Sequence, residues 1–272
     1  MSPSHSLTTH PLTATAAGEH LRRLRRQARL SQLELSLITG ISQRHLSCVE
    51  TGRAKPSPST LHALLSALDA PLEQRNEIFL AAGFAPRYMA STPDAPAMAM
   101  VHDAIEHILQ ANNPAPALVI ASNWDITAAN ASAGLLLAML GVQTTQPSGL
   151  NLLDTLLRPG GLGDHLVNAD EIRAIAWQRA AREAFSNPEL AELLRKLPGP
   201  ADLPLSPALS PVVLTRVRSG QGELNFLSTF TTFGMPLDIS VASLRIEHLI
   251  PADRQTWQVM TAAYAQWSAA AV

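Results

Sequence analysis

The chain has 272 residues, 46% of them hydrophobic and 15% charged, which is typical of a globular protein. Because one core seldom organises more than about 200 residues, this length predicts two domains. The single cysteine, Cys48, excludes an internal disulfide and a cysteine-rich zinc site. The apolar runs are all shorter than the roughly 20 residues of a membrane-spanning helix, so no membrane span is predicted.

The net charge of −2 conceals an uneven distribution. Residues 1–55 carry eight Lys and Arg against three acidic residues, whereas residues 91–272 carry ten basic against sixteen acidic residues. A basic N-terminal part on an acidic chain indicates a face for a polyanion, with chance clustering as the alternative.

The first 17 residues are rich in Ser and Thr and lack both a basic leader and an apolar stretch. We therefore expect a flexible tail over residues 1–17 rather than a secretory signal, and a cytoplasmic protein. Five short helices are predicted over residues 18–85. The first begins at Gly18 and has arginines outside its apolar face, the fourth is capped by Ser59, and the fifth ends near Gly83.

The second and third helices form the strongest motif. Ser31 and Glu34 have the spacing of a capping box, and Ser42 is placed to cap the next helix. The turn between the two helices has about three residues and contains Gly40, so the helices must cross steeply. Such a pair places its second helix in the major groove, with its N-terminal residues facing the base edges. The alternative is a helical pair that never meets DNA.

The residues offered to DNA follow from this geometry. Gln43 can bond adenine and Arg44 guanine through paired hydrogen bonds. Gln32 is placed to donate to a phosphate beside a helix N-terminus, while Arg53 and Lys55 follow the recognition helix and should contact the phosphate backbone. The full predicted set is Gln32, Ser42, Gln43, Arg44, His45, Ser47, Arg53 and Lys55.

Residues 18–83 contain the pattern S-Q…L…G-I-S…L…V-E-T-G-R…P-S, which closely resembles the Cro and lambda-repressor type domain of the XRE family. The resemblance implies an all-α, five-helix, lambda-repressor-like DNA-binding domain. It places Gln32, Gln43 and Arg44 at positions that usually touch DNA, whereas His45 and Ser47 match less closely. Ser36 stands where the family prefers Ala at a tight helix contact.

Residues 86–112 are predicted to be a linker and a connecting helix that starts near Asp94. The second domain, residues 113–272, is expected to be α+β, with an antiparallel sheet and helices laid over one face. Its predicted strands are residues 117–121, 125–129, 212–218, 223–232 and 237–249. Asn130 is placed to cap a helix, residues 151–197 are helical, a Pro-rich loop covers residues 198–211, and a last helix starts near Ala252.

The segment ALVIASNWDITAANASAGLLL, followed by LLDTLLRPGGL and GELNFLSTFTTFGMPLDISVASLRIEHLIPAD, resembles the PAS-like ligand-binding domain of MmyB-like regulators over residues 94–253. The resemblance implies a sensor that binds a small apolar ligand, with a fatty acyl chain as a candidate. Aromatic side chains on a sheet are typical of such a pocket, and filling the core is their alternative role. The predicted pocket residues are Trp124, Asn130, Trp177, Phe226, Phe230 and Phe233.

Motifs for catalysis are missing from the sequence. The turn at residues 158–165 lacks the lysine of a phosphate-binding loop, and no G-x-S-x-G or H-E-x-x-H occurs. We therefore expect no enzyme, no catalytic or metal-binding residue and no cofactor. The sequence predicts a homodimeric transcription regulator on double-stranded DNA, at a pseudo-palindromic operator with half-sites about 10 bp apart. The competing hypothesis is a DNA-binding adaptor whose second domain mediates dimerisation or protein interaction without a ligand.

Overall fold

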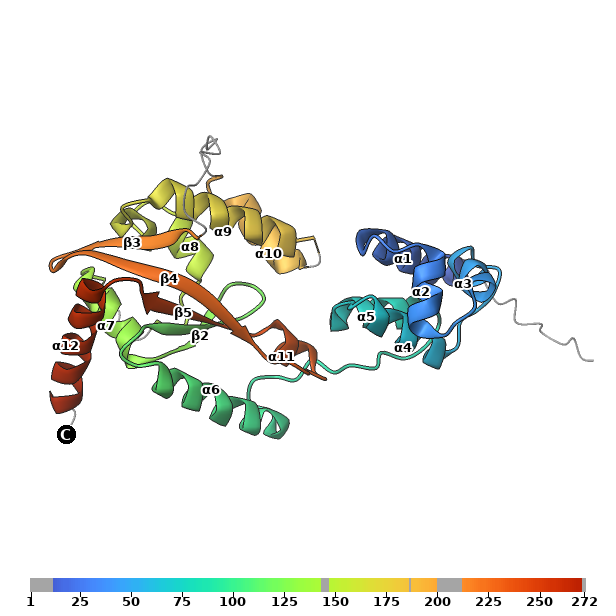
Figure 1. Ribbon diagram of the computed structural model, residues 1–272, viewed down its shortest axis with the longest axis horizontal. Helices are drawn as coiled ribbons and strands as arrows, with labels where there is room; N and C mark the ends of the chain where they lie inside the picture. The colour runs from blue at the N-terminus through green and yellow to red at the C-terminus, as the bar shows by residue number, and fades with distance from the viewer. Residues whose placement is uncertain (1–11, 143–146, 186, 200–211, 271–272) are drawn as a thin grey trace, which may run out of the picture. The chain divides into compact units, whose positions relative to one another are not determined.

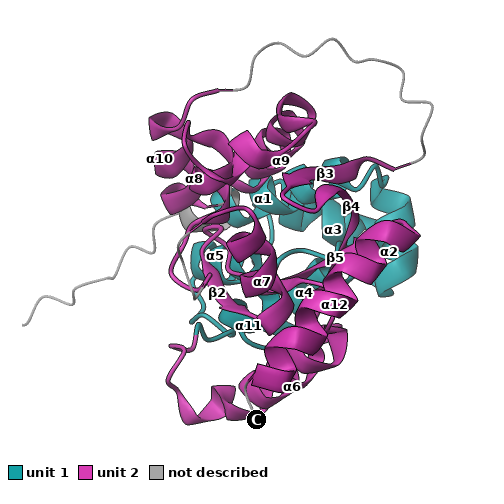
Figure 2. Ribbon diagram, turned by 90° about the vertical axis from the view of Figure 1, so that its left-hand side faces the viewer, with its two compact units in different colours: residues 1–90, 236–242 teal, residues 91–235, 243–272 magenta. Residues whose placement is uncertain are grey.

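A computed structural model describes residues 12–142, 147–185, 187–199 and 212–270. The chain divides into two compact units, coloured separately in Figure 2. Unit 1 comprises residues 1–90 and 236–242, and unit 2 comprises residues 91–235 and 243–272. Within unit 1 the segment 236–242 pairs with Met89, whose carbonyl accepts a hydrogen bond of 2.8 Å from the Ile239 N–H.

Unit 1 contains the five helices that the sequence predicts (Figure 1). They are α1 (Leu12–Gln27), α2 (Gln32–Thr39), α3 (Gln43–Glu50), α4 (Pro58–Ala67) and α5 (Leu72–Ala81). Both predicted caps of the central pair are confirmed. Ser31 and Glu34 form a complete capping box, and the Ser42 side chain accepts from the His45 N–H. Gly40 ends α2 with φ of +69°, a left-handed conformation that glycine adopts without strain.

Two predicted boundaries in unit 1 were wrong. Helix α1 begins at Leu12, so residues 12–17 belong to a helix and not to the predicted tail, while residues 1–11 lie outside the described residues. Ala17 is fully buried, and this packing explains the longer helix. Ser57, not Ser59, caps α4, because Pro58 occupies the first helical position, where its fixed φ suits a helix start.

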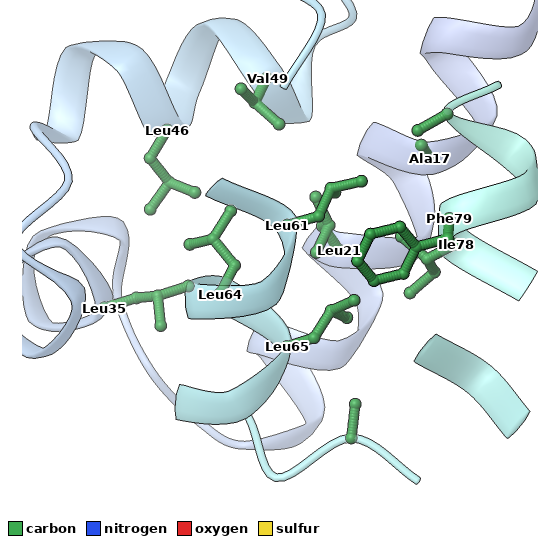
Figure 3. Packing of buried hydrophobic residues seen from close by; sticks show 12 residues of the cluster. Ala17, Leu21, Leu35, Leu46, Val49, Leu61, Leu64, Leu65, Ile78 and Phe79 are labelled. Atoms are coloured by element: carbon green, nitrogen blue, oxygen red, sulfur yellow. The ribbon is translucent and has the colours of Figure 1, made fainter. Parts of the chain in front are cut away.

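The core of unit 1 draws one apolar face from each helix. Leu21 of α1, Leu35 of α2, Leu46 of α3 and Leu64 of α4 are each at most 1% exposed and converge on one cluster (Figure 3). Each such leucine contributes about 1.5–3 kcal/mol by leaving water. This packing holds α3 on the outside of the unit with its polar face uncovered.

Unit 2 is built on one five-stranded sheet with the order β2-β1-β5-β4-β3, in which every neighbouring pair is antiparallel. The strands are β1 (Ala117–Ile120), β2 (Ile126–Ala129), β3 (Leu214–Ser219), β4 (Gly222–Thr232) and β5 (Arg245–Pro251). The helices are η1 (Pro96–Met98), α6 (Ala99–Asn112), α7 (Ala131–Met139), α8 (Leu152–Leu157), η2 (Leu162–His165), α9 (Ala169–Glu183), α10 (Pro188–Lys196), α11 (Ile239–Ser243, shared with unit 1) and α12 (Arg254–Ala270). The α+β, PAS-like expectation is confirmed.

The predicted last strand, residues 237–249, is only half correct. Residues 239–243 form the short helix α11, and β5 begins at Arg245. The Asp238 carboxylate accepts hydrogen bonds from the Ser240 and Val241 N–H groups, which starts a helical turn inside the predicted strand. The connecting helix α6 begins at Ala99 rather than near Asp94. Most of the predicted Pro-rich loop, residues 200–211, lies outside the described residues.

Helices cover both faces of the sheet, so the expectation of a single covered face was wrong. All four residues of β1 are buried. Ala117 and Val119 pack against α6, whereas Leu118 and Ile120 pack in the cluster of α8, α9 and α10. An interior strand of a sheet with helices on both sides has no solvent face, and its residues are therefore apolar without alternation.

Candidate DNA interface and ligand cavity

The recognition surface lies at the N-terminus of α3. Leu46 and Val49 are buried and fix the helix on the core. Gln43, Arg44 and His45 are consequently exposed together on its first turn. Their exposure at the start of a capped helix is the arrangement that presents polar side chains to base edges. Ser42 is also exposed, while Ser47 lies half-buried one turn later.

The predicted phosphate contact Gln32 is held by an ionic network that the sequence analysis missed. The Gln32 amide donates to the Glu50 carboxylate at 2.8 Å. Glu50 also accepts from Arg25 Nε at 2.6 Å and Nη2 at 2.9 Å, and Arg25 Nη1 donates to the Leu30 carbonyl at 2.7 Å. The network joins α1, the start of α2 and the end of α3. One N–H of the Gln32 amide remains to donate to a phosphate, and its carbonyl oxygen can accept from water.

Arg25 is one of the arginines that the sequence analysis places outside the apolar face of the first helix, and for Arg25 this prediction was wrong. It is 8% exposed, and Glu50 is 4% exposed. Burial alone would raise the pKa of Glu50, but the hydrogen bonds from Arg25 and Gln32 outweigh burial and hold that pKa below its ordinary value. The available signal was the position of Arg25 four residues after Leu21, on the buried face of α1.

Arg53 and Lys55, the other two predicted phosphate contacts, are both exposed. Arg53 Nε donates to the Thr51 hydroxyl at 3.0 Å, which holds the side chain beside the end of α3. The Lys55 ammonium lies 4.8 Å from the centre of the Phe84 ring, a cation–π contact that leaves its charge available to a phosphate.

Unit 2 contains two adjoining cavities between the sheet and helices α7 to α9. An apolar cavity of about 120 Å³ is lined mainly by leucines, among them Leu118, Leu136 and Leu137. A second cavity of about 250 Å³ is lined by aromatic, apolar and charged residues. Residues that line both are Leu152, Leu156, Ile172, Thr215 and Glu247. An apolar space beside a few polar groups is typical of a small-molecule site.

The structure brings two of the six predicted pocket residues to this site and places the other four elsewhere. Trp124 and Phe230 line the larger cavity. Phe226 shares a strand face with Phe230 but is fully buried in the cluster with Val217 and Leu224. Phe233 packs on the opposite side of the sheet, in the cluster of α6. Trp177 is partly buried and packs against the cluster of α8, α9 and α10, and it lines neither of these two cavities.

Asn130 was predicted as a polar anchor for a ligand, but its side chain hydrogen-bonds to backbone groups instead. Its oxygen accepts from the N–H groups of Ala117 and Ala133, both at 3.0 Å. Its nitrogen donates to the Ala115 carbonyl at 2.8 Å and to the Leu109 carbonyl at 3.3 Å. A fully bonded, buried amide caps α7 and ties it to β1, and it has nothing left to offer a ligand.

The larger cavity is lined by three charged residues that the sequence analysis did not single out, Arg179, Arg245 and Glu247. Glu183, which does not line the cavity, pairs with both arginines. Glu183 accepts from Arg245 Nη1 at 2.9 Å, from Arg179 Nε at 3.0 Å and from Trp124 Nε1 at 2.8 Å. Burial opposes ionisation of Glu183, but these donors hold its pKa below the ordinary value. Burial raises the pKa of Glu247. The sequence signal was the pair of charged residues two apart at the start of β5, R-I-E.

Comparison with known proteins supports both halves of this arrangement. The family of the MmyB-like transcription regulator ligand binding domain matches residues 101–263, more than half of the chain, and a helix-turn-helix domain family matches residues 16–78. An uncharacterized HTH-type transcriptional regulator, y4dJ of Sinorhizobium fredii (strain NBRC 101917 / NGR234), is 43% identical over 51 residues. That match covers 19% of this chain and 66% of the relative, just under two thirds of its length.

Two solved structures are also similar. The restriction-modification controller protein C.AhdI from Aeromonas hydrophila is 29% identical and covers 23% of this chain and 94% of its own, with a TM-score of 0.22. An RNA-binding light-oxygen-voltage receptor is 10% identical and covers 95% of this chain and 65% of its own, with a TM-score of 0.26. Within the described residues, no helix is both long and apolar enough to cross a membrane. The chain belongs to the family of MmyB-like transcription regulators, with a helix-turn-helix DNA-binding domain and a ligand-binding domain.

Proposed function

We propose that this regulator reads a pseudo-palindromic operator as a homodimer and that a small apolar ligand in unit 2 changes its affinity for DNA. The observation that carries the DNA half is the capped α3, with Gln43 and Arg44 exposed on its first turn. One such helix reaches only a few base pairs, and two copies on half-sites about 10 bp apart multiply the contacts. The protein then acts in the cytoplasm, by binding and not by catalysis.

The ligand half is supported by the two cavities between the sheet and α7 to α9. Their walls are mostly apolar, and they favour a compact or flexible apolar molecule, with a fatty acyl chain as a candidate. A ligand shifts an equilibrium only by binding one arrangement of the protein better than another. The ligand would therefore act by favouring one dimer arrangement over the other.

Two substitutions in full-length protein test the reading of DNA. Arg44→Ala should lower the preference for the cognate base at one operator position by about 1–3 kcal/mol. Lys55→Ala should weaken binding to all sequences alike and reduce the dependence on salt by about one counterion. Binding to an operator library at several salt concentrations measures both. Uniform weakening by both variants would contradict the division between base and phosphate contacts.

Native mass spectrometry of protein purified from cells tests the ligand and the dimer together. A dimer that retains a small molecule supports the proposal. A monomer at concentrations that saturate the operator would refute the dimer. A protein that carries no small molecule under several growth conditions, and that gains none when offered apolar compounds, would favour the adaptor that senses nothing.

A further inference from the structure

Helix α12 shows a gradient of burial along its core-facing side. The helix packs on α7 and on strands β4 and β5 (Figure 1). Thr256 and Met260 are fully buried. Ala263 is half-buried, and Trp267 is 45% exposed. These residues follow one another by four, three and four positions, which places them on the same face of a helix. The face that holds α12 on the sheet therefore continues into a part of the helix that is open to solvent.

The exposed end of this face is aromatic. The ring of Tyr264 stacks on that of Trp267, with the ring centres 5.7 Å apart. Trp257, seven residues before Tyr264, lies on the same side of the helix and is 46% exposed. Of the four Trp and two Tyr residues of the chain, α12 thus carries three. Trp and Tyr are enriched at the centres of protein–protein interfaces, where they contribute much of the binding energy.

The sequence around these aromatic residues lacks charge. Residues 255–272 contain no Lys, Arg, Asp, Glu or His, and neither do residues 126–153, which include α7. By contrast, α10 of the same unit has two acidic and two basic residues among its nine. The central part of a protein–protein interface is depleted in charged residues relative to the rest of the surface. The packed pair α7 and α12 therefore has the composition of an interface and not that of a solvated surface.

The lack of charge identifies the kind of partner. Nucleic acids and anionic membranes are held by basic side chains, and residues 255–272 have none. In a dimer with twofold symmetry the same surface meets itself, so any charge on it would face its own copy. An uncharged aromatic surface avoids this repulsion and is complementary to itself. The last turns of α12 extend beyond the strands (Figure 1), so two copies can bring these turns together without a collision of their sheets.

We propose that α12 forms the dimer interface of this regulator, with Tyr264 and Trp267 of one copy packed on the same segment of a second copy, close to the twofold axis. The inference rests on the proposed function, because that function requires a homodimer, and it adds the surface through which the two copies associate. Met260 of α12 and Leu136 of α7 belong to one buried cluster, so this surface is fixed on the core of unit 2.

Sedimentation velocity of the full-length protein over a range of concentrations tests the interface. Trp267→Glu removes an aromatic contact and places two negative charges together at the axis, so it should raise the dimer dissociation constant by about a hundredfold. Phe185→Glu, directly after α9, makes the same chemical change at a side chain that is 92% exposed. This matched control should associate as the wild type does. Circular dichroism confirms that each variant is folded.

Two further measurements assign the effect to a contact between the two copies. Trp267→Glu and Trp267→Arg should each be monomeric alone and should associate when mixed in equal amounts, because opposite charges then meet at the axis. Hydrogen exchange of the wild-type protein needs no variant. The amides of residues 263–270 should exchange about tenfold faster below the dimer dissociation constant than above it, since an uncovered helix end frays. The amides of β5 should show no such dependence on concentration.

The outcomes separate this inference from the proposed function. A wild-type protein that stays monomeric at concentrations that saturate the operator refutes both. A dimer that persists in folded Trp267→Glu, or that is lost equally in Phe185→Glu, refutes the α12 interface and leaves a homodimer joined elsewhere. Failure of the two oppositely charged variants to associate also refutes it. If Trp267→Glu does not fold, the exchange measurement decides, and protection of residues 263–270 that is independent of concentration overturns the inference.

Discussion

Replacing Glu50 by Gln removes the charge at the centre of the network that joins α1, α2 and α3. The side chain of Glu50 is 1% exposed and that of Arg25 is 9% exposed, so the pair lies out of contact with bulk water. Without the carboxylate, Arg25 stays buried and keeps the Leu30 carbonyl as its neutral acceptor. Breaking a buried pair in this way usually costs about 3–5 kcal/mol, and the remaining acceptors place this case near 3 kcal/mol.

The chain provides its own control for this measurement. Its four tryptophans, Trp124, Trp177, Trp257 and Trp267, all belong to unit 2. Tryptophan fluorescence during urea unfolding therefore follows unit 2, and hydrogen exchange of the amides in residues 18–83 follows unit 1. We expect Glu50→Gln to lower the protection of unit 1 by about 3 kcal/mol and to leave the fluorescence transition unchanged.

Two further variants complete the test. Glu77→Gln, on the exposed face of α5, should change the free energy of unfolding by less than about 0.5 kcal/mol. The double variant Arg25→Met/Glu50→Leu removes both charges and should recover most of the loss, because an apolar pair of similar volume carries no desolvation penalty. If Glu50→Gln stays within about 0.5 kcal/mol of the wild type, the buried pair does not hold the helices and the reasoning fails.

Three other predictions concern stability. The Cβ of Gly18→Ala would lie 2.4 Å from the Val49 carbonyl oxygen, so α1 and α3 must separate. We expect thermal unfolding to show a free energy of unfolding lower by about 1–3 kcal/mol. A higher free energy of unfolding would show that the contact yields easily. Asn130→Ala leaves two buried N–H groups without an acceptor and should destabilise unit 2 by about 2–4 kcal/mol. An unchanged fluorescence transition in urea would contradict the capping role of Asn130. The pKa of Glu50 is lower in the folded state than in the unfolded state, where it is about 4.3. The ionised Glu50 therefore stabilises the fold fully at neutral pH, and this stabilisation is lost as the pH falls through the folded pKa. The difference in exchange protection between wild type and Glu50→Gln should therefore shrink in acid, and an equal difference at pH 7 and pH 3 would refute this linkage.

Much of the fold could be predicted because its signals are local. Ser31, Glu34 and Ser42 start helices through bonds to backbone groups three residues away. Gly40 ends a helix because glycine adopts the left-handed conformation of this position without strain. The five helices of unit 1, the exposed Gln43 and Arg44, and the antiparallel strands of unit 2 all follow from such short-range rules. The predicted boundaries failed where packing or a neighbouring side chain decided, as at Ala17, which is buried on α1.

The partners of charged residues were decided by tertiary structure alone. Arg25 and Glu50 are 25 residues apart, and Glu183 and Arg245 are 62 apart, so no local spacing relates them. Burial determines what these charges do, since in water each would be solvated and weakly coupled. The sequence by itself determined which residues a recognition helix would present. Only the folded structure showed that Asn130 bonds to the backbone and that Arg245 pairs with Glu183, because hydrogen-bond capacity depends on which neighbours are brought within reach.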